Sequence, residues 1–228
     1  MLIRNDILQV RAPGVNFYVL RDEEELILLD AGFIGGRGLL RRALKRQGWR
    51  EEWIKGIIVT HGHLDHILNV GRFAEEFGAW IAAPRLDEDH YAGKPTYQGW
   101  ARTTEVLEWL GRPLLGFKSF VPDRLLDDGD EIDVWHGLRV VHLPGHTDGH
   151  CGFYCEKLKL LFTSDLFASY ALIQHFPPGI FNDEGKEIPK SARRALELDL
   201  EGVLPNHGDG ATPERHLERL RKLVGKRS

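Results

Sequence analysis

The sequence predicts a mixed α/β fold, in the broad sense that includes α+β, and three observations lead to this prediction. The chain has 228 residues, of which 42% are hydrophobic and 28% charged, as in globular proteins with a full core. Short apolar runs of strand length recur throughout, and stretches with helical periodicity lie between and after them. Neither an internal repeat nor a low-complexity tract breaks this alternation. We therefore expect a single domain that spans residues 1–228.

Apolar runs bounded by turn residues predict the buried strands. They cover residues 16–20, 25–30, 56–60, 80–84, 138–143, 151–155 and 158–165. The only cysteines, Cys151 and Cys155, lie on one of these strands and are separated by four residues, or about 13 Å. A disulfide needs Cα atoms within about 7 Å, so we expect free, partly buried thiols.

Apolar residues at helical spacing predict five helices. They cover residues 38–48, 64–77, 103–110, 192–198 and 213–224. In the last of these, Thr212 is placed as N-cap and Pro213 in the first turn, which is a typical start for a helix. Two further segments, 86–120 and 167–189, are long, irregular and rich in aromatic residues. Long loops of this kind are often functional, so we expect lids or pocket walls there, and segment 86–120 is equally compatible with a homodimer contact.

Polar residues follow the ends of several predicted strands at glycine-flanked turns. The stretch "HGHLDH" follows residue 60, "GHTDGH" follows "VVHLP", Asp165 ends "LLFTSD", and "NHGDG" follows "GVLP". Loops at strand ends can converge on one site. The candidate metal ligands are His61, His63, Asp65, His66, His146, Asp165 and His207.

Nitrogen and oxygen ligands without thiolate suit zinc, iron or manganese rather than a cysteine-bound structural zinc. Seven such ligands exceed the need of one tetrahedral ion. Shared between two ions through one bridging carboxylate, they would leave room for water at both, as a catalytic centre requires.

These motifs resemble the metallo-β-lactamase fold superfamily, whose hallmark is H-x-H-x-D-H. The resemblance rests on "THGHLDH", "PGHTDGH", "FTSD" and "PNHGDG", together with the early "LLDAG" turn at residues 28–32. It implies a four-layer αββα sandwich with the metals at one edge of the sheets. It also implies that His61, His63 and His146 bind the first metal and that Asp65, His66 and His207 bind the second, with Asp165 bridging them.

The resemblance implies a dinuclear hydrolase that acts on a small thioester, lactone or related ester, similar to the glyoxalase II branch. Two divalent ions, zinc first and iron or manganese as alternatives, would make a hydroxide at neutral pH, and Asp65 would both bind metal and orient this nucleophile. A second interpretation is a mononuclear non-haem iron persulfide dioxygenase, which has nearly the same ligands. A phosphodiesterase or nuclease is the third interpretation, and a binding module without catalysis is the fourth.

Neighbouring residues extend this prediction. Asp30 and Thr147 are expected to hold metal ligands in place. Four others could reach the ligands or the substrate: His150, Phe167, Tyr170 and His175. His142, by contrast, is expected to serve packing.

The remaining expectations concern partners and location. A net charge of −4 does not indicate nucleic acid as a partner, so we expect a small-molecule substrate. No run approaches the ~18 apolar residues of a membrane span, and the N-terminus lacks the pattern of a secretory signal. We therefore expect a cytoplasmic protein without a membrane partner.

Overall fold

The computed structural model describes residues 1–97 and 101–226. The chain divides into two compact units, each described by itself below. The first comprises Met1–Pro95 and Leu107–Leu126, and the second comprises Thr96–Val106 and Asp127–Ser228. The part of the expected lid that falls on residues 98–100 lies outside the described residues.

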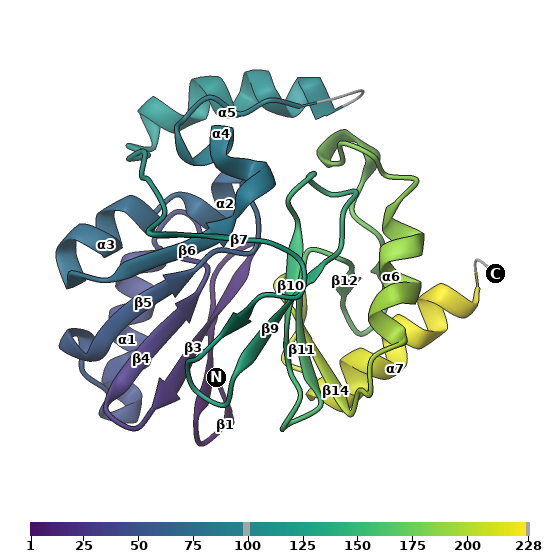
Figure 1. Cartoon of the computed structure of the whole chain (residues 1–228), viewed down its shortest axis with the longest axis horizontal. Helices are drawn as coiled ribbons and strands as arrows, with labels where there is room; N and C mark the ends of the chain where they lie inside the picture. The colour runs from purple at the N-terminus through teal and green to yellow at the C-terminus, as the bar shows by residue number, and fades with distance from the viewer. Residues whose placement is uncertain (98–100, 227–228) are drawn as a thin grey trace. The chain divides into compact units, whose positions relative to one another are not determined.

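A seven-stranded sheet forms the centre of the first unit, in the order β1 to β7 (Figure 1). Its strands are β1 (Leu2–Arg4), β2 (Ile7–Arg11), β3 (Asn16–Asp22), β4 (Glu25–Leu29), β5 (Ile54–Ile58), β6 (Trp80–Pro84) and β7 (Arg124–Leu126). Neighbouring strands from β1 to β4 are antiparallel, and those from β4 to β7 are parallel. The carboxyl ends of β4 and β5 therefore lie at the same edge of the sheet.

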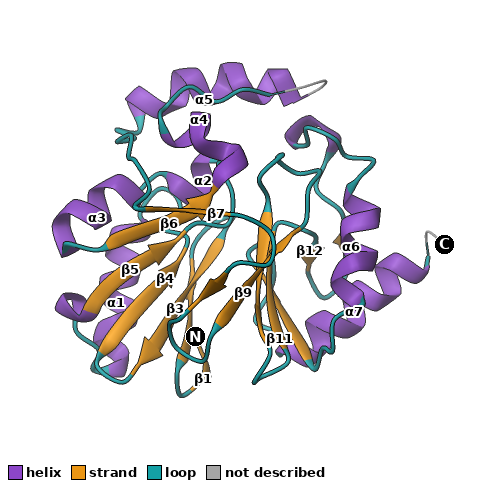
Figure 2. Cartoon of the chain, viewed as in Figure 1, coloured by secondary structure: helices purple, strands orange, loops and turns teal. Residues whose placement is uncertain are grey.

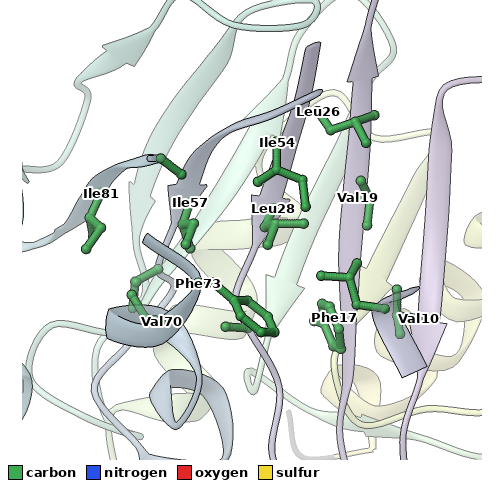
Figure 3. Close-up of a cluster of buried hydrophobic side chains, with 14 of the residues drawn as sticks. Val10, Phe17, Val19, Leu26, Leu28, Ile54, Ile57, Val70, Phe73 and Ile81 are labelled. Atoms are coloured by element: carbon green, nitrogen blue, oxygen red, sulfur yellow. The ribbon is translucent and has the colours of Figure 1, made fainter. Parts of the chain in front are cut away.

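Helices of the first unit follow the parallel strands. They are α1 (Gly36–Gln47), α2 (Leu64–Ile67), α3 (Val70–Phe77) and α4 (Glu88–Tyr91), with 3₁₀ turns at Glu51–Trp53 and Arg85–Asp87. Helix α5 (Arg102–Leu114) begins in the second unit and ends in the first. Leu40 and Leu44 of α1 and Phe73 of α3 join the sheet's apolar core (Figure 3). Burial of each such side chain contributes about 1.5–3 kcal/mol, which fixes these helices on the sheet.

A glycine in β5 permits the close pairing of the parallel strands. Gly56 lies opposite Trp80 of β6, and a Cβ atom at Gly56 would stand 2.2 Å from the Trp80 ring. Any larger residue would therefore push β6 away. Since β5 leads directly into the histidine-rich turn, this glycine helps to fix where that turn begins.

The second unit contains a five-stranded sheet in the order β14, β11, β10, β9, β8. Figure 2 draws its strands in orange. Its strands are β8 (Glu131–Ile132), β9 (Leu138–His142), β10 (Cys151–Cys155), β11 (Leu160–Ser164) and β14 (Gly202–Pro205), and a separate pair is formed by β12 (Ala168–Ser169) and β13 (Gln174–His175). Helices α6 (Ile188–Leu196) and α7 (Pro213–Gly225) and a 3₁₀ turn at Gly179–Phe181 complete the unit. Leu217 and Leu220 of α7 pack with Leu161 and Val203 of the sheet, which gives this unit a core of its own.

The predicted strands are confirmed, with small shifts at their ends, and Thr212 caps α7 as expected. The single helix predicted over residues 64–77 is wrong, because it breaks into α2 and α3. The carbonyl of His66 accepts a hydrogen bond from the Ala31 N–H, and the Asn69 side chain donates to the carbonyls of Ala31, Gly32 and Phe33. These contacts to the turn after β4 compete with continuation of the helix.

Both cysteines lie on β10 as buried thiols that form no disulfide, as the spacing predicts. In the part of the chain that the structure describes, no helix is both long and apolar enough to cross a membrane.

Candidate metal centre

Within the first unit, four candidate ligands lie in the turn that follows β5 and in the first turn of α2. The ring centroid of His61 lies 4.8 Å from that of His63 and 4.1 Å from that of His66. All three histidines are buried, whereas the side chain of Asp65 is 34% exposed. Its carboxylate oxygen lies 3.6 Å from Nε2 of His66. The turn therefore gathers three imidazoles and one carboxylate in a small volume.

Asp30, directly after β4, connects this turn to the neighbouring strand. One carboxylate oxygen accepts a hydrogen bond from the Thr60 N–H over 2.8 Å. The other lies 2.8 Å from both the Thr60 hydroxyl and Nδ1 of His66. Asp30 has φ 63°, in the left-handed region, which directs its side chain across the strand ends. A fully buried carboxylate with three donors is well satisfied, so it fixes both Thr60 and His66.

The hydrogen bonds of Thr60 and Asp30 determine which imidazole nitrogen is available to a metal. Because the Thr60 hydroxyl donates to Asp30, its oxygen accepts from Nδ1–H of His61, 3.0 Å away. His66 likewise donates its Nδ1–H to Asp30. In both rings Nε2 then carries the lone pair. A carboxylate or hydroxyl behind a histidine is the usual arrangement at metal sites.

Within the second unit, His146 has the same arrangement. Its Nδ1 lies 2.9 Å from Oδ1 of Asn182, and Nδ2 of Asn182 donates to the Pro177 carbonyl over 2.8 Å. That second bond fixes the amide with its oxygen toward His146, so His146 carries its proton on Nδ1 and its lone pair on Nε2.

Asp165 lies between two histidines of the second unit. Its Oδ2 atom is 3.3 Å from Nε2 of His146 and 2.9 Å from Nε2 of His207. In a tetrahedral site with metal–ligand bonds of ~2.0–2.1 Å, two ligand atoms lie about 3.3 Å from each other. The distances from Asp165 to the two histidines are close to this value. The preceding residue, Ser164, has φ 47°, a strained value that turns the chain sharply at the end of β11.

The residues of each unit fit divalent metal ions. His61, His63, Asp65 and His66 in the first unit, and His146, Asp165 and His207 in the second, are all candidate ligands. They offer neutral imidazole nitrogens and carboxylate oxygens, a donor set that suits zinc, iron or manganese. Three of the histidines are held through Nδ1 by Thr60, Asp30 and Asn182, which leaves Nε2 of each ring as the possible metal ligand. The donor chemistry therefore agrees with a metal centre.

The profile of the metallo-beta-lactamase superfamily matches residues 10–209 of the chain. The chain belongs to this superfamily. A hydroxyacylglutathione hydrolase, GloC of Haemophilus influenzae, is 29% identical over 164 residues, which cover 71% of this chain and 70% of that protein. The acyl-coenzyme A thioesterase MBLAC2 of Homo sapiens is 25% identical over 221 residues, which cover 88% of this chain and 75% of that protein. Both relatives are named as thioester hydrolases.

A solved structure of a metallo-beta-lactamase family protein from Thermus thermophilus, TTHA1429, superposes with a TM-score of 0.74 at 25% identity, covering 97% of this chain and 78% of that one. The metallo-β-lactamase fold predicted from the motifs is therefore confirmed. Membership also makes the chain one of a family of metal-dependent hydrolases.

Among the expected neighbours of this superfamily's ligands, Asp30 and His150 contact ligands directly. His150 is fully buried and its Nε2 accepts from the Asp165 N–H. Thr147 is also buried, and its carbonyl accepts from the N–H groups of Gly145 and His150. It therefore shapes the turn that carries His146. His142 donates its Nε2–H to the Asp148 carbonyl over 2.7 Å and lies outside the candidate ligand set.

The three expected substrate contacts lie in different surroundings. Phe167 is fully buried in the apolar core of the second unit, so its ring serves packing. Tyr170 is 38% exposed, and partial burial, followed by the negative charges of Asp165 and Asp209, raises the pKa of its hydroxyl. His175 is half-buried on β13, and its Nδ1 lies 2.8 Å from the Phe176 carbonyl.

Sequence reasoning missed Thr60, Asn182, Glu108 and Arg112. Asn182 lies in the segment expected to form a pocket wall, but nothing in one sequence distinguishes it from a turn residue. Thr60 is the last residue of the strand predicted over residues 56–60, and a strand end gives no sign of a hydrogen bond to His61. Glu108 and Arg112 form an ion pair at 2.6 Å, and their spacing of four residues is the sequence signal that could have pointed to it.

Proposed function

We propose that this member of the metallo-β-lactamase superfamily is a dinuclear metal-dependent hydrolase that cleaves a thioester or related ester of a small molecule. The observation that carries the proposal is the set of hydrogen bonds to Nδ1 of His61, His66 and His146, which prepares Nε2 of each ring as a metal ligand. Two relatives named as thioester hydrolases favour this bond type.

In the proposed centre, one divalent ion would be held by His61, His63 and His146, and a second by Asp65, His66 and His207, with Asp165 available to both. Support for this assignment comes from family membership and from the donor set of each unit. Zinc is the proposed metal, since it accepts this mixture of imidazole and carboxylate ligands. When bound, divalent ions lower the pKa of water toward neutrality and polarise the substrate carbonyl.

The chain's own residues supply orientation and proton transfer. Asp65 is the half-exposed carboxylate of the set, so it can accept a proton from the attacking water and return it to the leaving group. Asp30 and Asn182 hold His66 and His146 in the tautomer that binds metal. Without these partners the imidazoles could rotate, and the ligand geometry would be lost.

The proposed partner is a small-molecule substrate, not nucleic acid or a membrane, which the modest net charge of −4 favours. A cytoplasmic location is proposed on the basis of the two thiols on β10 that form no disulfide, which suit a reducing compartment. Large apolar side chains on α5, including Leu107, Trp109 and Leu114, are exposed. They agree with a substrate lid and equally with a homodimer contact.

The decisive experiment is elemental analysis of protein purified without added metal, combined with O₂ uptake in the presence of glutathione persulfide and turnover of a thioester and lactone panel. About two zinc or manganese ions per chain with thioester turnover and no O₂ uptake is the expected result. One iron per chain with substrate-dependent O₂ uptake would replace the hydrolase with a persulfide dioxygenase.

A further inference from the structure

Charged side chains from outside the ligand turn hold its backbone within the first unit. The N–H of Gly62 donates to Oδ2 of Asp87 over 2.7 Å, and the N–H of Leu64 donates to Oε1 of Glu108 over 2.9 Å. Gly62 lies between two histidine ligands, and Leu64 lies between His63 and Asp65. Each of these backbone groups is therefore fixed at a point where a small rotation would move a candidate ligand.

Helix α2, which carries Asp65 and His66, starts without a cap of its own. Its N-cap residue is His63, which makes no side-chain capping bond. Serine, threonine, aspartate or asparagine normally occupies this position and binds the first free N–H groups. Here Glu108 of α5, 44 residues further along the chain, accepts the hydrogen bond of Leu64 instead. His63 can therefore occupy the N-cap position and still be a candidate metal ligand, because Glu108 stabilises the start of the helix in its place.

Arg112 fixes Glu108 in this role. Its guanidinium donates to Oε2 of Glu108 over 2.6 Å, to the His90 carbonyl over 2.8 Å and to the Gly62 carbonyl over 3.5 Å. The guanidinium also lies over the Phe117 ring, 4.6 Å from its centre. The side chains of Arg112 and Glu108 are only 5% and 9% exposed. The pair therefore holds one orientation and contacts the ligand turn at both a carbonyl and an N–H group.

A buried ion pair of this kind is a weak source of stability, because removing both charges from water costs about as much as their attraction returns. Apolar replacements of similar volume are often neutral or stabilising. An account based only on folding stability therefore explains poorly why two charges stand behind the ligand turn. Their contacts with Gly62 and Leu64 offer a different explanation.

We infer that Glu108 and Arg112 of α5 are positioning residues that set the metal affinity of the turn carrying His61, His63, Asp65 and His66. This inference rests on the proposed metal-dependent function. It makes α5, which the sequence indicated only as part of a lid, a support of the metal centre. Without the Glu108 carboxylate, the Leu64 N–H loses its acceptor and the start of α2 can move. The candidate ligands would then lie further from the geometry that binds metal, and the metal affinity would fall.

The test compares zinc affinity, measured by competition with a chromogenic chelator, with the thermal unfolding of the metal-free chain. The variants are Glu108→Leu, which loses the acceptor, and Glu108→Gln, which keeps an oxygen for Leu64. Glu105→Leu on the same helix is the matched control. Glu108→Leu is expected to bind zinc about 10–100-fold more weakly, with a smaller loss in Glu108→Gln and none in Glu105→Leu. Glu108→Leu also leaves the Arg112 charge buried without its partner, so the melting temperature of its metal-free form should fall. The double variant Glu108→Leu/Arg112→Met removes both charges, so it should melt near the wild-type temperature while still binding zinc more weakly.

Wild-type zinc affinity in Glu108→Leu would overturn the inference and leave the proposed function standing. A wild-type chain that binds neither zinc nor manganese would overturn both. If Glu108→Leu does not fold, Arg112→Lys provides the second variant, because it keeps the charge but loses the forked contact with Glu108 and His90. Unchanged zinc affinity in a folded Arg112→Lys together with unchanged affinity in Glu108→Gln would likewise contradict the inference.

Discussion

The backbone N–H of Asp165 donates a hydrogen bond to Nε2 of His150 over 3.2 Å. On the other side of the same ring, Nδ1–H donates to the Leu143 carbonyl over 2.8 Å. These two bonds require a neutral imidazole in one tautomer. His150 thus links the end of β9 to the carboxylate that lies between His146 and His207, and it does so without being a ligand itself.

Replacement of His150 by leucine is expected to weaken zinc binding about 10–100-fold, because the turn after Ser164 would no longer be fixed. It should also lower the free energy of unfolding by about 1–3 kcal/mol for each buried group left without its partner. Chelator competition and urea unfolding measure the two effects. His142→Gln, on the adjacent strand, is the control, and an equal loss of zinc affinity in both variants would contradict the assigned role.

Replacement of Asp30 by asparagine tests the carboxylate behind His66. Asparagine tolerates the positive φ of this position, so the backbone should be preserved. Its amide cannot accept from Thr60 N–H, the Thr60 hydroxyl and His66 Nδ1–H together, so one donor loses its partner. We expect a loss of about 1.5–3 kcal/mol in urea unfolding and weaker zinc binding. Asp133→Asn, at an exposed position, should change neither measurement.

The elements predicted from the sequence are those whose pattern is local. Strands such as β3 and β10 are uninterrupted apolar runs, and α7 carries its own N-cap in Thr212. The break between α2 and α3 could not be predicted, because it depends on Asn69 reaching carbonyls more than thirty residues earlier in the chain. Local periodicity cannot predict a contact between residues so far apart in the sequence.

The same distinction applies to the candidate metal centre. The seven candidate ligands could be named because each follows a strand in a motif rich in His and Asp. The partners of these ligands could not, since Asn182 lies 36 residues from His146 and Glu108 lies 44 residues from Leu64. Asp30 was an exception, because it lies in the "LLDAG" turn, which is part of the resemblance to the superfamily.

Gly62→Ala is expected to destabilise the protein and to displace the ligand turn. A Cβ atom at Gly62 would lie 2.4 Å from Cβ of the buried His90, a distance that requires backbone movement. We expect a loss of about 1–3 kcal/mol in unfolding free energy, as for other overpacked sites, together with weaker zinc binding. Gly38→Ala, in α1 with open space around it, is the matched control and should gain about 0.5–1 kcal/mol. Similar effects of the two substitutions would contradict the steric argument.

His216 predicts a pH dependence of stability. The ring is buried beside Ser169, whose hydroxyl lies 2.6 Å from its Nδ1. Burial lowers the pKa of His216 to about 4; Arg219 acts in the same direction, and Asp209 opposes them. Because the unfolded chain takes up this proton near pH 6.5 and the folded chain only near pH 4, stability falls as the pH drops through that window. The loss at its lower end is about 3 kcal/mol.

Urea unfolding across this pH range, compared between the wild type and His216→Gln, isolates the contribution of this ring from that of the carboxylates. In the variant, the free energy of unfolding should change less with pH between the two pKa values. His136→Gln, on the connection between β8 and β9, is expected to retain the wild-type slope. Equal slopes in the wild type and His216→Gln would show that His216 does not titrate differently in the folded and unfolded states.

Removal and return of metal should change the thermal stability of the chain in proportion to occupancy. A ligand that binds only the folded state adds about 2.7 kcal/mol at a concentration 100 times its Kd, which corresponds to roughly 5–10 °C in a protein of this size. We therefore expect the melting temperature of chelator-treated protein to rise by this amount when zinc is restored. In the Asp165→Asn variant, restoring zinc should raise the melting temperature much less. An amide is a poorer metal ligand than a carboxylate, and Asp165 lies next to both His146 and His207. An identical melting temperature with and without zinc in the wild type would argue against a metal centre in this chain.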